Sequence, residues 1–163
     1  MIRIGLLSDT HSYLHPRVIE FFKTTDEIWH AGDMGNISVA EKLSELKPFK
    51  GVYGNIDGQD VRAIYPKELR FNCESVDTWI THIGGYPGRY NPDVKDRIIS
   101  NPPKLFICGH SHILKVIYDK KLNLLHINPG AAGKYGLHHV ITAIRFSING
   151  SDIKDLEILE LKR

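Results

Sequence analysis

The stretch IRIGLLSDTH, residues 2–11, decides the fold because it joins an apolar run directly to a polar cluster. Residues Ile2 to Leu7 are typical of a short buried strand, and Ser-Asp-Thr-His follows as a loop. In open α/β sheets, ligands bind outside the carboxyl ends of the strands. This cluster is therefore expected at a binding site.

The same alternation continues through the first third of the chain. Apolar residues at helical spacing follow the first strand, and another strand, helix and strand come after them. The predicted elements are a strand at 2–7, a helix around 14–22, a strand at 27–30, a helix around 39–46 and a strand at 49–53. This order predicts parallel strands joined by helical crossovers.

The remainder of the chain is rich in strands. A Gly/Pro-rich loop, HIGGYPGRYNPD at residues 82–93, and a short helix at 94–99 interrupt it. The predicted strands are 69–73, 76–81, 105–108, 114–118, 122–127, 139–146 and 153–161. Many strands with few helices predict an α/β fold in which two sheets pack face to face, with helices outside, in one domain over residues 1–163.

Composition narrows the class of protein. The chain has 163 residues, 21 of them basic and 19 acidic, and a formal net charge of +2. This balance argues against a dedicated nucleic-acid tract but leaves a nucleotide substrate open. Cys73 and Cys108 share no CxxC spacing, which indicates two reduced thiols. No apolar run fits a signal peptide or a membrane span, so we expect a cytoplasmic protein without a membrane partner.

Five polar clusters each follow an apolar, strand-like run. They are Asp9-x-His11, Gly32-Asp33, Gly54-Asn55, His82 and Gly109-His110-Ser111-His112. Together they supply carboxylates, a carboxamide and imidazoles, ligand types that suit Mn, Fe, Ni or Zn. Residues i and i+2 of an extended backbone face the same way, so both ends of the Asp-x-His and His-x-His spacings are expected to reach one ion.

Each cluster alone also allows a structural interpretation. A single histidine on a strand is commonly a hydrogen-bonded core residue, and Asp-Thr-His alone is compatible with a helix cap. The complete ordered set, each member at a strand end, favours a metal site. Asp33 is the natural candidate to bridge two cations, which can activate water and hold a phosphate.

The ordered set resembles the calcineurin-like metallophosphoesterase superfamily. GNID (residues 54–57), INPG (127–130) and the short chain are similar to its small prokaryotic phosphodiesterase branch. The resemblance implies a double β-sheet sandwich flanked by helices, in four αββα layers. It also implies two divalent ions, with Mn preferred over Ni, Fe or Zn. The implied ligands are Asp9, His11, Asp33 and His112 for one ion, and Asp33, Asn55, His82 and His110 for the other.

Two positions depart from the family pattern. Ile56 stands where the wider superfamily often has a histidine that protonates the leaving group, while the acidic Asp57 is kept, as is common in the small branch. We therefore expect selectivity for substrates with a good leaving group. Gly84 stands two places after His82, where relatives often have a second histidine.

Several further residues are candidates for supporting roles. Asn55 and His82 are expected to position the phosphate, and His30 and Asp57 to orient ligand side chains from behind. Arg89 could bind a phosphate with its guanidinium group, although a solvated loop arginine is the simpler interpretation. The unassigned histidines, for which surface or structural roles are favoured, are His15, His138 and His139.

The predicted function is hydrolysis of small phosphate diesters, with nucleotide diesters as candidates, by attack of a metal-bridging hydroxide on phosphorus. The alternative is a protein-interaction scaffold, because the same superfamily includes a retromer subunit that serves mainly as a binding surface. The intact set of proposed ligands argues against that alternative. A nuclease or monoesterase on the same site is a third hypothesis, and a homo-oligomer is left open by the strand-rich C-terminal region.

Overall fold

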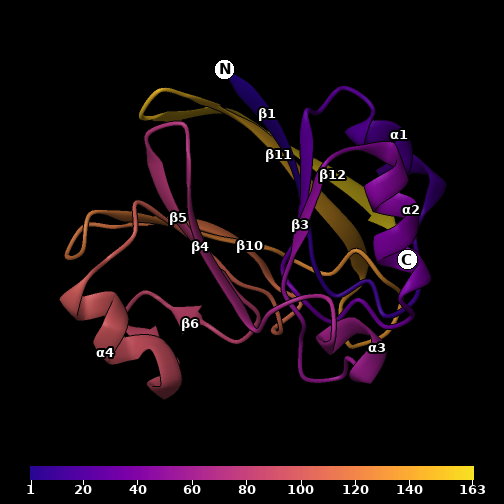
Figure 1. The fold of residues 1–163 in the computed structure, drawn as a ribbon, viewed down its shortest axis with the longest axis horizontal. Helices are drawn as coiled ribbons and strands as arrows, with labels where there is room; N and C mark the ends of the chain where they lie inside the picture. The colour runs from indigo at the N-terminus through magenta and orange to yellow at the C-terminus, as the bar shows by residue number, and fades with distance from the viewer.

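Two five-stranded sheets face each other in the computed structural model, which describes residues 1–163 (Figure 1). The first sheet has the order β12-β11-β1-β2-β3 and the second the order β4-β5-β8-β10-β9. The strands of the first sheet are β1 (Ile2–Leu7), β2 (Glu27–His30), β3 (Phe49–Gly51), β11 (Val140–Asn149) and β12 (Asp152–Lys162). Those of the second are β4 (Glu68–Cys73), β5 (Val76–Thr81), β8 (Leu105–Ile107), β9 (Leu114–Asp119) and β10 (Leu124–Pro129).

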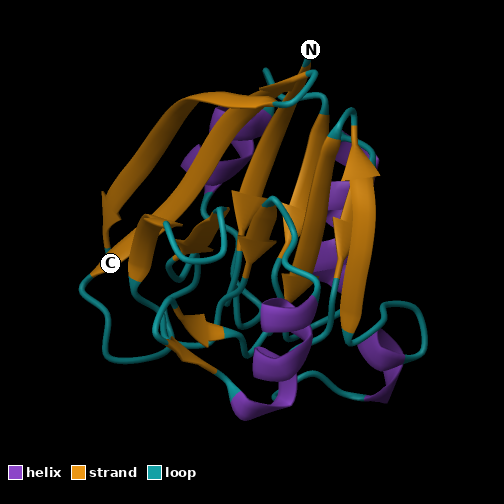
Figure 2. Cartoon of the chain, turned by 90° about the vertical axis from the view of Figure 1, so that its left-hand side faces the viewer, coloured by secondary structure: helices purple, strands orange, loops and turns teal.

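Each sheet has a run of three parallel strands. In the first sheet β1, β2 and β3 are parallel, with β3 at the edge, and β11 and β12 pair antiparallel on the other side of β1. In the second sheet β5, β8 and β10 are parallel, and the edge strands β4 and β9 pair antiparallel with their neighbours. The predicted strand-helix-strand order of the first third is confirmed. Parallel strands bring their carboxyl ends to one edge, and the loops that follow them gather at the lower end in Figure 2.

Neighbouring residues of one strand enter different cores. Leu6 of β1 lies in the core between the two sheets, whereas Leu7 lies in the core under the helices. On β5, Ile80 faces the first sheet and Trp79 faces the opposite way. Because successive side chains of a strand alternate in direction, strands covered on both faces are apolar throughout. This explains the continuous apolar runs in the sequence.

Helices cover the outer face of both sheets. Helices α1 (Pro16–Phe22) and α2 (Ser38–Leu46) pack on the first sheet, through Phe22 and Leu43 among others. Helix α4 (Pro92–Ser100) packs on the second sheet through Val94 and Ile98. The predicted sandwich of two sheets flanked by helices is therefore confirmed. None of the helices has the length and apolar character needed to span a membrane.

Two local features differ from the prediction. The loop at 82–93 contains a hairpin of β6 (Gly85–Tyr86) and β7 (Arg89–Tyr90), whose two-residue turn at 87–88 includes Gly88 with a positive φ of 82°. A single-turn helix, α3 (Gln59–Arg62), follows the GNID segment. It is too short to give a periodic signal in the sequence.

Candidate metal centre

The polar clusters predicted from the sequence meet at one end of the sandwich. They follow β1, β2, β3, β5 and β8, the parallel strands whose carboxyl ends share that edge. Two groups of side chains form there, and the candidate ligand atoms within each group lie within 4.8 Å of one another. The first group is Asp9, His11 and His112, and the second is Asp33, His82 and His110.

Asp33 lies between the two groups. Its Oδ2 atom is 3.5 Å from His11 Nε2 in the first group and 3.2 Å from His82 Nε2 in the second. Its Oδ1 atom accepts a hydrogen bond of 3.1 Å from the backbone N–H of Ile56, which fixes the carboxylate. The Asp33 carboxylate therefore lies close to members of both groups.

The hydrogen bonds of Asp9 and His82 leave one atom of each free to bind a cation. Asp9 Oδ2 accepts from Ser8 Oγ at 2.7 Å and from the His110 N–H at 3.1 Å. Its Oδ1 has no hydrogen-bond partner. His82 Nδ1 donates to the carbonyl of Ala31 at 2.7 Å, which turns Nε2 toward the carboxylates.

Three buried atoms at this centre lack a hydrogen-bond partner, namely Asp9 Oδ1, His11 Nε2 and His82 Nε2. Buried polar atoms are normally satisfied, so a cluster of exceptions requires an explanation. A carboxylate oxygen and two imidazole nitrogens are also the atoms that divalent transition metals prefer. The donor set therefore fits a metal site.

Burial and charge act in opposite directions on the two carboxylates. Burial alone would raise the pKa of Asp9, but the imidazoles of His11 and His112 hold it below its usual value. Burial would likewise raise the pKa of Asp33, and His82 lowers it. Both carboxylates are therefore ionised at neutral pH and give the centre the negative charge that attracts cations.

The backbone at five of the seven candidate ligands is not extended, and the geometric reason given for the Asp-x-His and His-x-His spacings was wrong. Positive φ angles of 44° to 73° occur at Asp9, His11, Asp33, His110 and His112. The chain reverses sharply after each strand and so turns these side chains inward. Such left-handed residues cost of order 1–3 kcal/mol each and cluster at functional sites.

A sequence profile of the calcineurin-like phosphoesterase superfamily domain matches residues 2–151. The chain belongs to this superfamily. A probable metallophosphoesterase of Methanothermobacter thermautotrophicus is 27% identical over 135 residues, which cover 78% of this chain and 76% of that protein. Membership supports phosphoester hydrolysis with divalent metal ions.

Solved structures share the phosphoesterase fold. A novel archaeal phosphodiesterase has a TM-score of 0.73 at 22% identity, over 98% of this chain and all of that one. Wild-type Vps29 of Entamoeba histolytica in complex with Zn²⁺ has a TM-score of 0.76 at 12% identity, over 99% of each chain. At these identities the likeness concerns the fold.

Asp57 of the phosphoesterase GNID segment supports the site differently from the prediction. Its carboxylate accepts hydrogen bonds from the backbone N–H groups of Met34 (3.2 Å), Gly35 (2.8 Å) and Gly54 (2.8 Å), and from no histidine. These bonds tie the loop after β2 to the loop after β3. Asp57 therefore positions the backbone beside Asp33 and Asn55, and its side chain, 3% exposed, is not placed to touch a substrate.

Replacing Asp57 tests this positioning role. Asp57→Ala leaves three N–H groups without their acceptor, and we expect a loss of about 3 kcal/mol in the free energy of unfolding. Asp57→Asn keeps one acceptor oxygen and is expected to lose less. Urea unfolding in EDTA measures both losses, with Asp96→Ala on the exposed face of α4 as control. An unchanged midpoint for Asp57→Ala would contradict the role.

His30 was predicted to orient a ligand side chain, but its ring contacts backbone and Thr10 instead. It is fully buried, and burial lowers its pKa to about 3, so the ring is neutral. Nδ1 accepts from the Gly32 N–H at 3.1 Å, and Nε2 lies 3.0 Å from Thr10 Oγ1, which donates to the Met34 carbonyl. The ring thus links the loops that follow β1 and β2.

The remaining predicted residues lie in different surroundings. Asn55 Oδ1 is 3.1 Å from His110 Nδ1, beside the second group. Arg89 is exposed on β7 and lines a hollow that also contains His110. His15 caps α1 by accepting from the Arg17 N–H at 3.1 Å, which gives it a structural role.

Of the other unassigned histidines, His139 is exposed, and His138 packs edge-on against His112 with ring centroids 5.1 Å apart. The Nε2 atom of His138 lies 2.7 Å from the Gly133 carbonyl. A supporting position next to a ligand histidine was not foreseen for His138.

Sequence reasoning missed several residues that border the centre, among them Asn128 and Tyr135. Asn128, within INPG, donates to the Gly109 carbonyl (3.0 Å) and to Ser111 Oγ (3.1 Å) and so holds the GHSH loop. The INPG motif drew attention to Asn128, but it did not indicate what the side chain contacts. Tyr135 stacks on His11 with centroids 5.1 Å apart, and nothing in the local sequence indicates that contact.

Proposed function

We propose that this chain is a metal-dependent phosphodiesterase that binds two divalent cations and hydrolyses small phosphate diesters. The observation that carries the proposal is the pair of adjacent ligand groups with Asp33 between them. Asp9, His11 and His112 would hold one cation, and His82, His110 and Asn55 the other. When bound, the cations supply Lewis-acid activation of water and neutralise charge on the phosphate. Mn²⁺ is the first choice, with Ni²⁺, Fe²⁺ and Zn²⁺ as alternatives.

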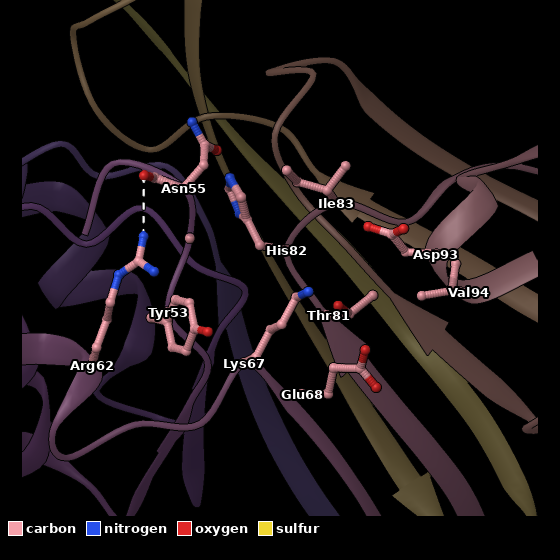
Figure 3. Close-up of a pocket in the computed structure, with 11 residues that line it drawn as sticks. Tyr53, Asn55, Arg62, Lys67, Glu68, Thr81, His82, Ile83, Asp93 and Val94 are labelled. Atoms are coloured by element: carbon pink, nitrogen blue, oxygen red, sulfur yellow. Dashed lines mark hydrogen bonds between the residues drawn. The ribbon is translucent and has the colours of Figure 1, made fainter. Parts of the chain in front are cut away.

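The surroundings of the second group support a diester. A hollow of about 260 Å³ lies beside Asn55 and His82 (Figure 3). Another, of about 330 Å³, lies beside His110 and Arg89. Ile83 lines both. A phosphate diester carries two substituents, and two hollows that border the second group offer a place for each.

The protein's own groups have limited means to protonate a leaving group. Ile56 is 46% exposed at the position where many relatives have a histidine, and it keeps only a backbone role, the hydrogen bond to Asp33. A leaving group that departs without a proton is then favoured. We therefore expect nitrophenyl esters to react far faster than alkyl esters.

The test compares bis-p-nitrophenyl phosphate with p-nitrophenyl phosphate, using protein stripped of metal and resupplied with Mn²⁺. We expect kcat/KM for the diester to exceed that for the monoester by about tenfold or more, which corresponds to about 1.4 kcal/mol. EDTA should abolish both activities. Faster hydrolysis of the monoester would reassign the site to a monoesterase.

The scaffold alternative makes a different prediction in the same experiment. Vps29 structures share this fold, which keeps a binding function open. A chain that binds two ions by calorimetry but hydrolyses neither ester with any of the four metals would favour the scaffold. The buried atoms without hydrogen-bond partners favour a metal site, which the enzyme requires, and turnover separates the two alternatives.

A further inference from the structure

We propose that the hollow beside Asn55 and His82 binds a second phosphate on one substituent of the substrate, through Lys67 and Arg62. This inference rests on the proposed function, because it assigns a role to one of the two substituents of the diester. Both side chains line the hollow; in Figure 3 Arg62 lies beside Tyr53 and Asn55, and Lys67 lies between Tyr53 and Thr81. Neither was a candidate in the sequence.

Arg62 is held in place and still has donors to offer. Its Nε atom donates to the Asp57 carbonyl at 2.6 Å, and one terminal nitrogen donates to the Asn55 carbonyl at 3.3 Å. The guanidinium also lies over the Tyr53 ring, 4.5 Å from its centroid. A guanidinium has five N–H donors, so most remain for an anion, and their orientation is fixed before binding.

Lys67 contributes a positive charge that forms no salt bridge with an acid of the protein. The neighbouring acid, Glu68, is bound instead by Arg97 through two hydrogen bonds of 2.8 Å. The side chain of Lys67 extends into the hollow toward Thr81 in Figure 3. An ammonium and a pre-oriented guanidinium that line one hollow are the groups that proteins use to bind phosphate.

The two sides of the hollow differ in charge. Asp93 lies on one side, next to Val94 and away from Arg62, and its carboxylate accepts no hydrogen bond. Glu68 is paired with Arg97, so Asp93 is the acid of the hollow whose carboxylate forms no salt bridge. A second phosphate is therefore favoured near Lys67 and disfavoured near Asp93.

Calorimetry on the Mn²⁺-loaded protein tests the subsite without requiring turnover. The probes are adenosine 5′-monophosphate and two compounds that add one phosphate at different spacings, the adenosine 3′,5′- and 2′,5′-bisphosphates. We expect at least one bisphosphate to bind about tenfold more tightly than the monophosphate, the size of one charge-assisted hydrogen bond. Lys67→Gln should bring that ratio close to one.

Two variants control the result. Lys120→Gln, an exposed lysine in the turn between β9 and β10, should keep the full ratio. Asp93→Asn removes the opposing charge and should raise the ratio about twofold. Lys67→Gln is preferred to a change at Arg62, because Arg62 also supports the Asn55 loop.

Two outcomes would overturn the subsite: neither bisphosphate binds more tightly than the monophosphate, or the gain survives in Lys67→Gln. Failure of the proposed function looks different. In that case the wild-type protein does not hydrolyse bis-p-nitrophenyl phosphate with any metal, whatever the ratio of affinities. A Lys67-dependent ratio without turnover would establish the subsite and remove the phosphodiesterase.

Discussion

Asp33→Asn is expected to lower kcat/KM for bis-p-nitrophenyl phosphate by about a thousandfold or more, which is about 4 kcal/mol of transition-state stabilisation. Asp33 stands between both ligand groups, with Oδ2 near His11 and His82. A neutral carboxamide would not supply the negative charge that Asp33 would offer to the two proposed cations. The loss should therefore be larger than for a residue that contributes to one group alone.

Asparagine is the informative replacement because Asp33 has a φ of 56°. Asparagine tolerates this left-handed conformation better than alanine, so the loop is kept and a loss of activity reports chemistry rather than misfolding. Steady-state kinetics with Mn²⁺ measures the effect, and Asp96→Asn on α4 serves as control. Activity of Asp33→Asn within tenfold of wild type would refute the bridging role.

Saturation with Mn²⁺ is expected to raise the melting temperature by roughly 10–20 °C relative to EDTA. Each site filled at about 100 times its Kd adds about 2.7 kcal/mol, and 1 kcal/mol corresponds to about 2–4 °C for a chain of this size. The metal-free protein carries two buried carboxylates in proximity and three ligand atoms without partners. Bound cations would offset the repulsion between the carboxylates and give the three atoms a partner. They would do so only in the folded state, and so would stabilise it.

Calorimetric melting measures this shift, and titration calorimetry should give two ions per chain. His112→Ala removes a ligand of the first group and His110→Ala one of the second, so each should lose one ion and about half of the shift. The exposed His139→Ala should change neither. A shift of less than about 3 °C with saturating Mn²⁺, Ni²⁺, Fe²⁺ and Zn²⁺ would refute a two-metal centre.

Much of the candidate site could be predicted from the sequence, because the candidate ligands directly follow the strands. A buried strand that ends in Asp9 or Asp33 fixes where its loop begins, and parallel pairing brings those loops to one edge. The seven candidate ligands all lie at that edge. Their direction was not predictable from spacing, because left-handed backbone at residues such as His11 and His112 depends on packing between loops.

The supporting residues could not be read from the sequence. Asp57 is close to Asn55 in the chain, yet its carboxylate bonds to Met34 and Gly35, more than twenty residues away. Lys67 joins the site because β4 starts beside the centre, and it carries no motif. Such contacts depend on long-range packing, which local sequence patterns do not predict.

By itself, therefore, the sequence determined the order of the main strands and helices, the two-sheet class and the identity of the candidate ligands. Hydrophobic periodicity and polar residues at strand ends are local properties, so they can be recognised without knowing which strands pair. The tertiary structure alone decided that Asp33 lies between two groups, that Asp57 and His30 hold backbone, and that Lys67 and Arg62 face one hollow. Those relations join residues distant along the chain, and only the packing of the two sheets brings them together.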